Sequence, residues 1–367
     1  MHRISSNNRI AIIGCYPPPY GGVGMGVKRL ADLLESLGIQ FVVYNTLTDM
    51  EIPGKVISVY RHRALWSLLY LLKGKEKIII LRTSNLFAYL FGGLLYFLRK
   101  KQALIFVGNM VYPSLAKRRE RTLRGIIMRW VIKHAYLIVG TSRQICQTLI
   151  DAGAEKSRVR NIAGFMLPKN AYKKVEFPDT VKSFFEQHKP VLLSMAFPFY
   201  NEEGKNIYGF DILLEAVSII IKKYPKIGVL LLVPGEDTTL KDYWPELLKE
   251  IDARDLNQNV LPYLNTGEMY PFLQLSDIYI RPTRTDGDAS SIREAIYMNV
   301  PVLASDCAPR PNGTITYPVE DIDKFVNRLD EMISDMSYYK KMVAQIEMDD
   351  NTETYIQLIK ELLDNSD

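Results

Sequence analysis

Residues 282–295, PTRTDGDASSIREA, carry two carboxylates eight positions apart at what reads as a strand-to-helix junction. Asp286 follows a strand-like run, DIYIR, and Glu294 opens a helical pattern, REAIYMN. Between them, GDASS supplies consecutive backbone N–H groups at a helix N-terminus, where the helix dipole favours an anion. The stretch therefore predicts an anion-binding site at the carboxyl end of a strand.

Glu294 also has a purely local interpretation. Ser291 and Glu294 have the spacing of a capping box, in which the glutamate returns to the backbone amide of the cap residue. The residues by themselves leave both interpretations open.

A second candidate site is GGVGMG at residues 21–26, which follows an apolar run, RIAIIGCY, and a proline-rich loop. Glycines let backbone amides approach a ligand, and a helix that starts near Val27 would direct its positive end at the loop. The spacing GxGxxG fails in both registers, because Val27 or Arg29 stands at the third glycine position, and GK[ST] is absent. A phosphate-binding loop and a tight turn both remain open, whereas a dinucleotide fingerprint and a Walker loop are excluded.

The rest of the 367-residue chain alternates short apolar runs with helical patterns, in two consecutive series. This order predicts an α/β protein with two doubly wound, Rossmann-like domains, whose ligands bind at the carboxyl ends of strands in the cleft between domains. We expect an N-terminal domain at residues 1–168, a proline-punctuated linker at 169–190 and a second domain at 191–345. A last helix within 346–367 is expected to pack back toward the N-terminal domain.

Composition narrows the function classes. Apolar residues make up 47% of the chain, and its three cysteines and four histidines are scattered without ligand-like spacing, so we expect no metal site. The N-terminus lacks the pattern of a signal peptide, and the longest apolar run, residues 86–98, is shorter than the roughly 20 residues of a membrane-spanning helix. These features predict a cytoplasmic location.

Charge is unevenly distributed along the chain. Residues 1–180 hold 28 Lys and Arg against 10 Asp and Glu, whereas the remainder holds 18 against 31. A basic segment at 117–133 interleaves its cations with Ile126, Ile127, Met128 and Trp130, and RKK follows the apolar run 86–98. This favours an anionic membrane surface as a partner of the N-terminal domain. The alternative is an apolar face that belongs to the core and cations that are solvated; nucleic acid is not expected, since no binding motif accompanies the charge.

Four stretches resemble the large retaining group of glycosyltransferases with the GT-B fold, often called family 4. They are PPPYGGVGMG with LADLLESLG near the start, GTSRQICQTLIDAGAEKSRVRNIAGF, YGFDILLEA, and RPTRTDGDASSIREAIYMNVPVLASD. The resemblance covers nearly the whole chain, and the last stretch is its most specific part, since the family has a signature of two acidic residues eight apart. It implies two Rossmann-like domains facing each other across a cleft, no cofactor, no metal, and a nucleotide diphosphate-sugar such as a UDP-sugar as donor.

The resemblance also implies roles for individual residues. Asp286 would contact hydroxyls of the donor sugar and Glu294 the ribose, while Gly21 and Gly22 would approach the phosphates from the N-terminal domain. The amides that hold the diphosphate would come from Gly287, Asp288, Ala289, Ser290 and Ser291.

The chain departs from the family at its cations. The family keeps an Arg and a Lys that neutralise the leaving diphosphate, but the matching region, LLSMAFPFYNEEGKNIYGF, has no Arg and places Tyr208 at the Lys position. Because a leaving diphosphate develops charge that a cation or amide must meet, we expect Lys205, Arg281 or Arg284 to substitute. The histidine that the family often carries after a central strand is also missing, with Asn109 nearby.

We therefore expect a retaining, metal-independent glycosyltransferase that acts on a saccharide or lipid-linked acceptor in bacterial surface polysaccharide or glycolipid biosynthesis. It would be peripheral to the inner face of the cytoplasmic membrane. One alternative is a catalytically silent nucleotide-sugar-binding protein on the same fold; another is a dinucleotide-dependent oxidoreductase, against which the failed GxGxxG spacing argues.

Overall fold

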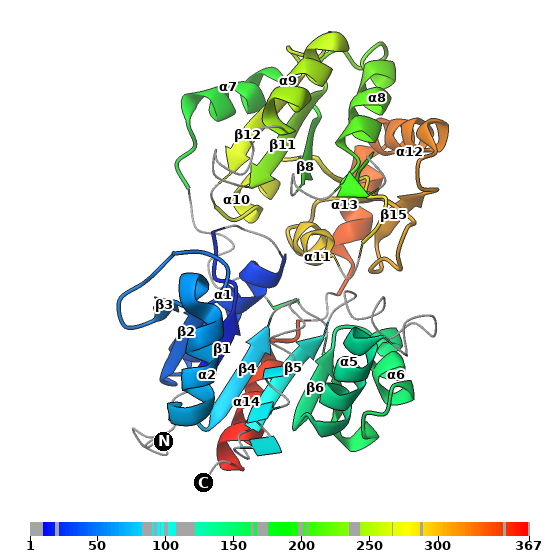
Figure 1. Ribbon diagram of the computed structural model, residues 1–367. Coiled ribbons are helices and arrows are strands. Elements are labelled where there is room, and N and C mark those ends of the chain that lie inside the picture. The colour runs from blue at the N-terminus through cyan, green and yellow to red at the C-terminus, as the bar shows by residue number, and fades with distance from the viewer. Residues whose placement is uncertain are drawn as a thin grey trace. The chain divides into compact units, whose positions relative to one another are not determined.

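The computed structural model describes residues 10–18, 22–82, 90–91, 94–95, 97–98, 102–107, 122–162, 165–166, 175–196, 201–202, 205–234, 243–265, 267–286, 289–347 and 350–365. The chain divides into two compact units: unit 1 comprises Met1–Pro168 and Asp350–Asp367, and unit 2 comprises Lys169–Asp349. Each unit is an α/β sandwich around a parallel sheet (Figure 1).

Unit 1 is built on a seven-stranded sheet within the described residues, and every neighbouring pair of its strands is parallel. Its strands, in their order across the sheet, are β3 (Val56–Ser58), β2 (Phe41–Asn45), β1 (Ile10–Gly14), β4 (Ile78–Arg82), β5 (Gln102–Val107), β6 (Leu137–Gly140) and β7 (Val159–Asn161). This outward order from a central first strand is the doubly wound arrangement that the sequence predicts.

Helices cover both faces of this sheet, because its strands are apolar on both sides. Ile10 and Ile12 of β1 pack with α1 (Gly22–Ser36) and α14 (Thr352–Asp364) on one face, whereas Ala11 and Ile13 face the other helical layer. That second layer contains α2 (Arg63–Lys73), helical residues within 90–98, α5 (Leu123–His134) and α6 (Arg143–Asp151). Two short 3-10 helices, η1 (Tyr60–His62) and η4 (Lys156–Arg158), complete the described elements of the unit.

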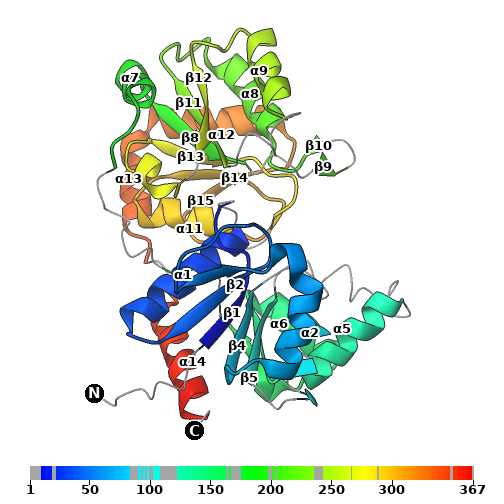
Figure 2. The same cartoon turned by 60° about the vertical axis from the view of Figure 1, so that its left-hand side comes forward.

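Unit 2 repeats the plan with a six-stranded parallel sheet among the described residues. Its strands, in order across the sheet, are β12 (Val260–Asn265), β11 (Gly228–Pro234), β8 (Val191–Met195), β13 (Ile278–Arg281), β14 (Val302–Ser305) and β15 (Thr314–Tyr317). A short antiparallel pair, β9 (Asn201–Glu202) and β10 (Lys205–Asn206), lies apart from this sheet (Figure 2).

The helices of unit 2 form two layers as well. One core cluster contains residues of α8 (Phe210–Ile220), α9 (Tyr243–Ala253) and α12 (Ile322–Ser334). The other contains residues of α7 (Asp179–Gln187), α10 (Tyr270–Leu273), α11 (Ser290–Tyr297) and α13 (Met336–Ala344). In α12, Phe325, Leu329 and Met332 are buried at helical spacing, which explains why this segment folds as an amphipathic helix.

Several elements differ from the sequence-based expectations. Helix α7 lies inside the segment expected to be a linker, and its Val181 and Phe184 are part of the core of unit 2. Helix α2, with the sequence RALWSLLYLLK, is not among the predicted elements, and it carries apolar residues on both its packed and its exposed sides. In α5, Met128 is buried, and Ile127 and Trp130 pack against the core, so most of the apolar face of this segment belongs to the core rather than to a membrane.

The last helix, α14, belongs to the core of unit 1. Tyr355, Leu358, Ile359 and Leu362 are buried beside strand residues such as Ile10 and helix residues such as Leu34. Asn351, next to the start of α14, donates from Nδ2 to the backbone oxygen of Phe165 at 3.2 Å. Within the described residues, no helix has both the length and the apolar composition needed to cross a bilayer.

We predict that Ile359→Ala lowers the free energy of unfolding of unit 1 by about 2–5 kcal/mol, because it opens a cavity against the sheet. Ile356→Ala on the same helix, at a half-buried position, is the matched control and should cost clearly less. Chemical denaturation followed by circular dichroism measures both. Equal losses for the two variants would contradict the packing described for α14.

Candidate functional site

The acidic stretch lies where β13 ends, near the middle of the sheet of unit 2. Strand β13 pairs with β8 on one side and β14 on the other, all in parallel. The carboxyl ends of these strands therefore meet at one edge, and the loops that follow β13 and β14 lie close together there. Gly287 and Asp288 of the stretch, like Gly21 of the glycine-rich segment, lie outside the described residues.

Asp286 is held between two arginines at this edge. Arg281, the last residue of β13, donates from Nε and Nη2 to the two carboxylate oxygens of Asp286, each at 3.0 Å. Arg310, from the loop after β14, donates from Nη1 to Oδ2 of Asp286 at 2.7 Å. Thr283 adds a hydroxyl donor at 3.2 Å. We call Arg281, Asp286 and Arg310 the arginine–aspartate cluster; its formal charge is +1.

All three members of the cluster have largely buried side chains, so the attraction between Asp286 and the two arginines is strong. Burial would raise the pKa of Asp286, but the charges and hydrogen bonds of Arg281 and Arg310 outweigh burial and lower the pKa to about 2. Asp286 is therefore ionised throughout the neutral range. Its carboxylate fixes the positions of two cations that would otherwise repel each other.

Tyr208, which stands where the resembled family keeps a lysine, lies against this cluster. The guanidinium of Arg281 lies 5.4 Å from the centroid of the Tyr208 ring, a cation–π contact. The positive charge near this position thus belongs to Arg281, while the aromatic ring supports it. Of the three cations proposed as substitutes, Arg281 is the one bonded to Asp286.

Arg284 and Lys205 meet carboxylates elsewhere. Arg284 donates to both carboxylate oxygens of Asp211, at 2.9 and 2.7 Å, and to Glu320 at 2.7 Å. It also donates to the backbone oxygen of Asn206 at 2.7 Å. Lys205 pairs with the same Glu320 at 3.0 Å and is exposed. Arg284 therefore ties the segment before α8 to the acidic stretch, and Lys205 lies at its solvent edge.

Gly209 makes this junction possible. It has a left-handed backbone, with φ of 67°, at the N-terminus of α8. A Cβ at this position would lie 2.0 Å from the backbone oxygen of Pro282, so the segment before α8 packs directly on the acidic stretch. Both the backbone conformation and the close approach require glycine.

Helix α11 begins earlier than the sequence suggests, and its cap differs. The cap residue is Ala289, without a side-chain hydrogen bond, and Ser290 and Ser291 are the first two helical residues. Ser291 is thus inside the helix, and the capping-box interpretation of Ser291 and Glu294 is wrong. Glu294 lies in the second helical turn rather than the first, and its side chain is buried.

The glycine-rich segment is also different from the expected loop. Helix α1 starts at Gly22, so Gly24 and Gly26 are helical and buried. A Cβ on Gly26 would lie 2.3 Å from the guanidinium of Arg82, at the end of β4, which gives this glycine a packing role. Gly22 has open space around its Cβ position and lies in the first turn of the helix.

Arg310 is the site residue that sequence reasoning missed. It lies in APRPNG, where no local pattern distinguishes it, and its partners Thr283 and Asp286 are more than 20 positions away. Its Nε also donates to the backbone oxygen of Ser305 at 2.8 Å. Among the described residues, no group of three or more His, Cys, Asp and Glu side chains is arranged to bind a metal ion.

Comparison with known families places this edge of unit 2 in context. Residues 199–335, which contain the whole arginine–aspartate cluster, match the family model described as glycosyl transferases group 1. The chain has the GT-B fold, and the part of it that carries the cluster is similar to glycosyl transferases group 1. An uncharacterised glycosyltransferase of Haemophilus influenzae is 27% identical over 224 residues, a match that spans 56% of each of the two chains.

Solved structures share the fold of this GT-B chain over nearly its full length. HepE from Anabaena, solved in complex with UDP and glucose, matches with a TM-score of 0.71 at 14% identity, covering 98% of this chain and 100% of that one. Sucrose-phosphate synthase from Thermosynechococcus elongatus matches with a TM-score of 0.70 at 15% identity and the same coverage. At these identities the likeness shows the fold, and it confirms the two Rossmann-like domains.

We predict that Asp286→Asn lowers the free energy of unfolding by about 3–5 kcal/mol near neutral pH, because it leaves Arg281 and Arg310 buried without their anion. The wild-type carboxylate contributes fully above its unfolded pKa of about 4 and loses this contribution as pH falls toward its folded pKa of about 2. The difference between wild type and variant should therefore shrink as pH is lowered from about 5. Denaturation at a series of pH values measures it.

Asp179→Asn, at a carboxylate that is 97% exposed in its pair with Lys182, is the control for this series. It should change stability little at any pH. A difference between wild type and Asp286→Asn that stays constant with pH would contradict the electrostatic role of Asp286.

We predict that Gly209→Ala lowers the melting temperature by more than Gly38→Ala does. Both glycines have a left-handed backbone, with φ of 67° and 68°, so both variants carry the same conformational cost of about 1 kcal/mol. Only residue 209 adds a clash, because nothing lies within 4 Å of the Cβ position of Gly38. Thermal unfolding of the two variants separates the conformational cost from the cost of the clash. Equal shifts in melting temperature would show that the contact with Pro282 is unimportant.

Proposed function

We propose that the chain is a retaining glycosyltransferase, which moves a sugar from a UDP-sugar to an acceptor hydroxyl, with the donor bound by unit 2. The arginine–aspartate cluster carries the proposal: it places two fixed cations at the carboxyl end of β13, inside the segment that matches the glycosyltransferase family model. HepE, which shares the fold, was solved with UDP and glucose, which supports a UDP-sugar as the donor class.

The chemistry of this proposal is electrostatic. As the bond between sugar and diphosphate breaks, negative charge develops on the diphosphate, and preorganised donors stabilise it most effectively. Arg281 and Arg310 supply fixed positive charge near that position, and the amides at the start of α11, from Ala289 to Ser291, supply the helix N-terminus. Because these groups meet the charge, the proposed reaction needs no metal ion.

The remaining residues bind and orient the donor. Asp286, held rigidly by its arginines, contacts hydroxyls of the donor sugar, and the buried Glu294 contacts the ribose. Arg284 positions the segment before α8 through Asp211 and the backbone of Asn206. The acceptor hydroxyl approaches from the face that the diphosphate leaves, so the configuration at the sugar is retained.

The acceptor follows from the charge of unit 1. Unit 1 holds 26 Lys and Arg against 13 Asp and Glu, an excess of 13 positive charges, which suits a protein peripheral to an anionic membrane. We propose a lipid-linked saccharide as acceptor, in the assembly of a bacterial surface polysaccharide or glycolipid at the cytoplasmic face.

A second candidate function is a catalytically silent protein that binds a nucleotide sugar. The observation that favours it is the pairing of the candidate cations: Arg281 with Asp286, Arg284 with Asp211, and Lys205 with Glu320. Turnover separates the two candidates, since both predict donor binding.

We predict that Arg281→Ala lowers the rate of UDP release from UDP-sugars about 10²–10³-fold, the loss typical of one preorganised donor at a developing negative charge. Release of UDP is measured with purified protein, with and without acceptor lipid extract, and with a chelator to test the metal-independent mechanism. Arg254→Ala, which removes a cation just after α9 that is paired with Glu250, is the matched control and should leave the rate unchanged.

Wild-type protein that binds UDP-sugars in calorimetry but never turns them over, across sugars and acceptor extracts, would identify the silent binding protein instead. Abolition of turnover by the chelator would contradict the metal-independent mechanism. Thermal unfolding of Arg281→Ala establishes that a lost rate is not lost folding.

A further inference from the structure

Helix α2 exposes an apolar face that no part of the proposed chemistry uses. Leu65, Leu68, Leu69 and Leu72 are between 45% and 60% exposed, and their spacing of three, four and seven places them on one side of the helix. The opposite side of α2 is already packed, with Trp66, Tyr70 and Leu71 against the core of unit 1. We call the four outward residues the leucine face.

The same helical layer carries further exposed apolar residues beyond α2. Aromatic contacts connect its members: the rings of Trp66 and Phe91 are 6.0 Å apart, and those of Phe97 and Trp130 are 5.8 Å apart. Eight of the 18 exposed large hydrophobic residues found among the described residues lie in this one layer of unit 1. Besides the leucine face they are Phe97, Leu98, Leu123 and Ile126.

The sequence that contains this layer is rich in positive charge. Residues 52–150 contain 18 Lys and Arg but only two acidic residues, Glu76 and Glu120. Glu76 is buried, where it accepts hydrogen bonds from Tyr44 and Tyr70. Lys73, Lys75 and Lys77 are exposed at the end of α2. An apolar face with exposed cations at one end suits a surface whose polar groups are anionic.

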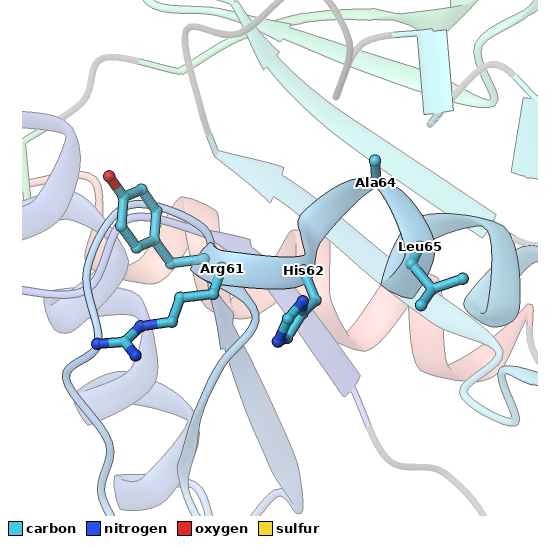
Figure 3. A pocket seen from close by; sticks show the side chains of 5 residues that line it. Arg61, His62, Ala64 and Leu65 are labelled. Atoms are coloured by element: carbon cyan, nitrogen blue, oxygen red, sulfur yellow. The ribbon is translucent and has the colours of Figure 1, made fainter.

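A hollow opens at the other end of the leucine face. It has a volume of about 600 Å³ and is lined by Tyr60, Arg61, His62, Ala64 and Leu65 (Figure 3). Arg61 forms a two-pronged contact with Asp49, at 3.0 and 2.8 Å, in which both side chains are exposed. In Figure 3 the side chains of His62 and Leu65 extend from one side of the chain, while Ala64 points to the other. The imidazole of His62 therefore lies on the same side as Leu65 of the leucine face.

We propose that the leucine face is the membrane-docking surface of the protein, with the leucines in the interfacial layer of an anionic bilayer and Lys73, Lys75 and Lys77 among its acidic headgroups. The proposal deepens the membrane association in the proposed function and rests on it, but it is independent of the transfer reaction. It moves the main apolar contact from residues 117–133, where the sequence suggested it, to α2, because the core occupies most of that other face.

Charge decides between a bilayer and a second copy of this chain. Two copies that met through this layer would bring two strongly basic surfaces together, and the like charges would repel. An anionic bilayer presents the opposite charge. It also offers an apolar layer beneath its headgroups that can accept side chains such as Leu68 and Leu72.

Co-sedimentation with lipid vesicles tests the proposal. Wild-type protein should bind vesicles of phosphatidylcholine with phosphatidylglycerol, and bind weakly to vesicles of phosphatidylcholine alone. The double variant Leu68→Glu/Leu72→Glu should lower the partition coefficient about tenfold or more, because it removes apolar contact and adds repulsion. The matched control is Leu248→Glu/Leu275→Glu, which makes the same change at two exposed leucines of unit 2 and should leave binding unchanged.

Two further readouts, release of UDP and light scattering, complete the test. Release of UDP measured in solution should be the same for wild type and both double variants, so a failed membrane proposal and a failed transfer proposal are distinguishable. Wild type that ignores the anionic vesicles, or Leu68→Glu/Leu72→Glu that binds them as wild type does, would overturn the docking surface. A wild-type dimer in light scattering that this variant converts to a monomer would overturn it too, by showing an interface between copies.

Discussion

The bond between Asp286 and its two arginines organises the candidate site. Like charges repel strongly in a buried environment, so Arg281 and Arg310 can share one edge of a sheet only with an anion between them. Asp286 supplies that anion and thereby connects three pieces of chain: the end of β13, the loop that follows it, and the loop after β14. Helix α11 begins at Ser290, four positions after Asp286.

A second set of contacts connects the segment before α8 to this cluster. Arg284 reaches Asp211 and the backbone of Asn206, and Gly209 lies against the oxygen of Pro282. Tyr208 is thereby held under Arg281. Where the family that the sequence resembles has a lysine, this chain has the aromatic ring of Tyr208 beside Arg281. Arg281 lies at the carboxyl edge of the sheet, where folds of this type concentrate their ligand-binding groups.

The sequence predicts the fold well and the site only in part. Continuous apolar runs such as IAIIG and VLLLV identify buried parallel strands, and a residue such as Ser142 marks a helix start that the structure confirms. The sequence does not predict helix α2, because the apolar residues of this helix face both the core and the surface. The sequence does not reveal the role of Arg310, because Arg310 lies in a loop more than 20 residues from Asp286 and such long-range pairing leaves no local pattern. The close contact of Gly26 with Arg82 shows that a glycine in a glycine-rich segment can serve packing as well as ligand binding.

The position of α14 has a consequence for how the protein is made. The polypeptide leaves unit 1 at Pro168, completes unit 2, and returns to unit 1 at Asp350. During synthesis, residues such as Ile10 and Leu34 are therefore made long before the helix that covers them. Part of one face of the first sheet stays uncovered until α14 has been made, whereas the second unit by then has its full sequence available. The unit whose synthesis begins first is therefore completed after the second one.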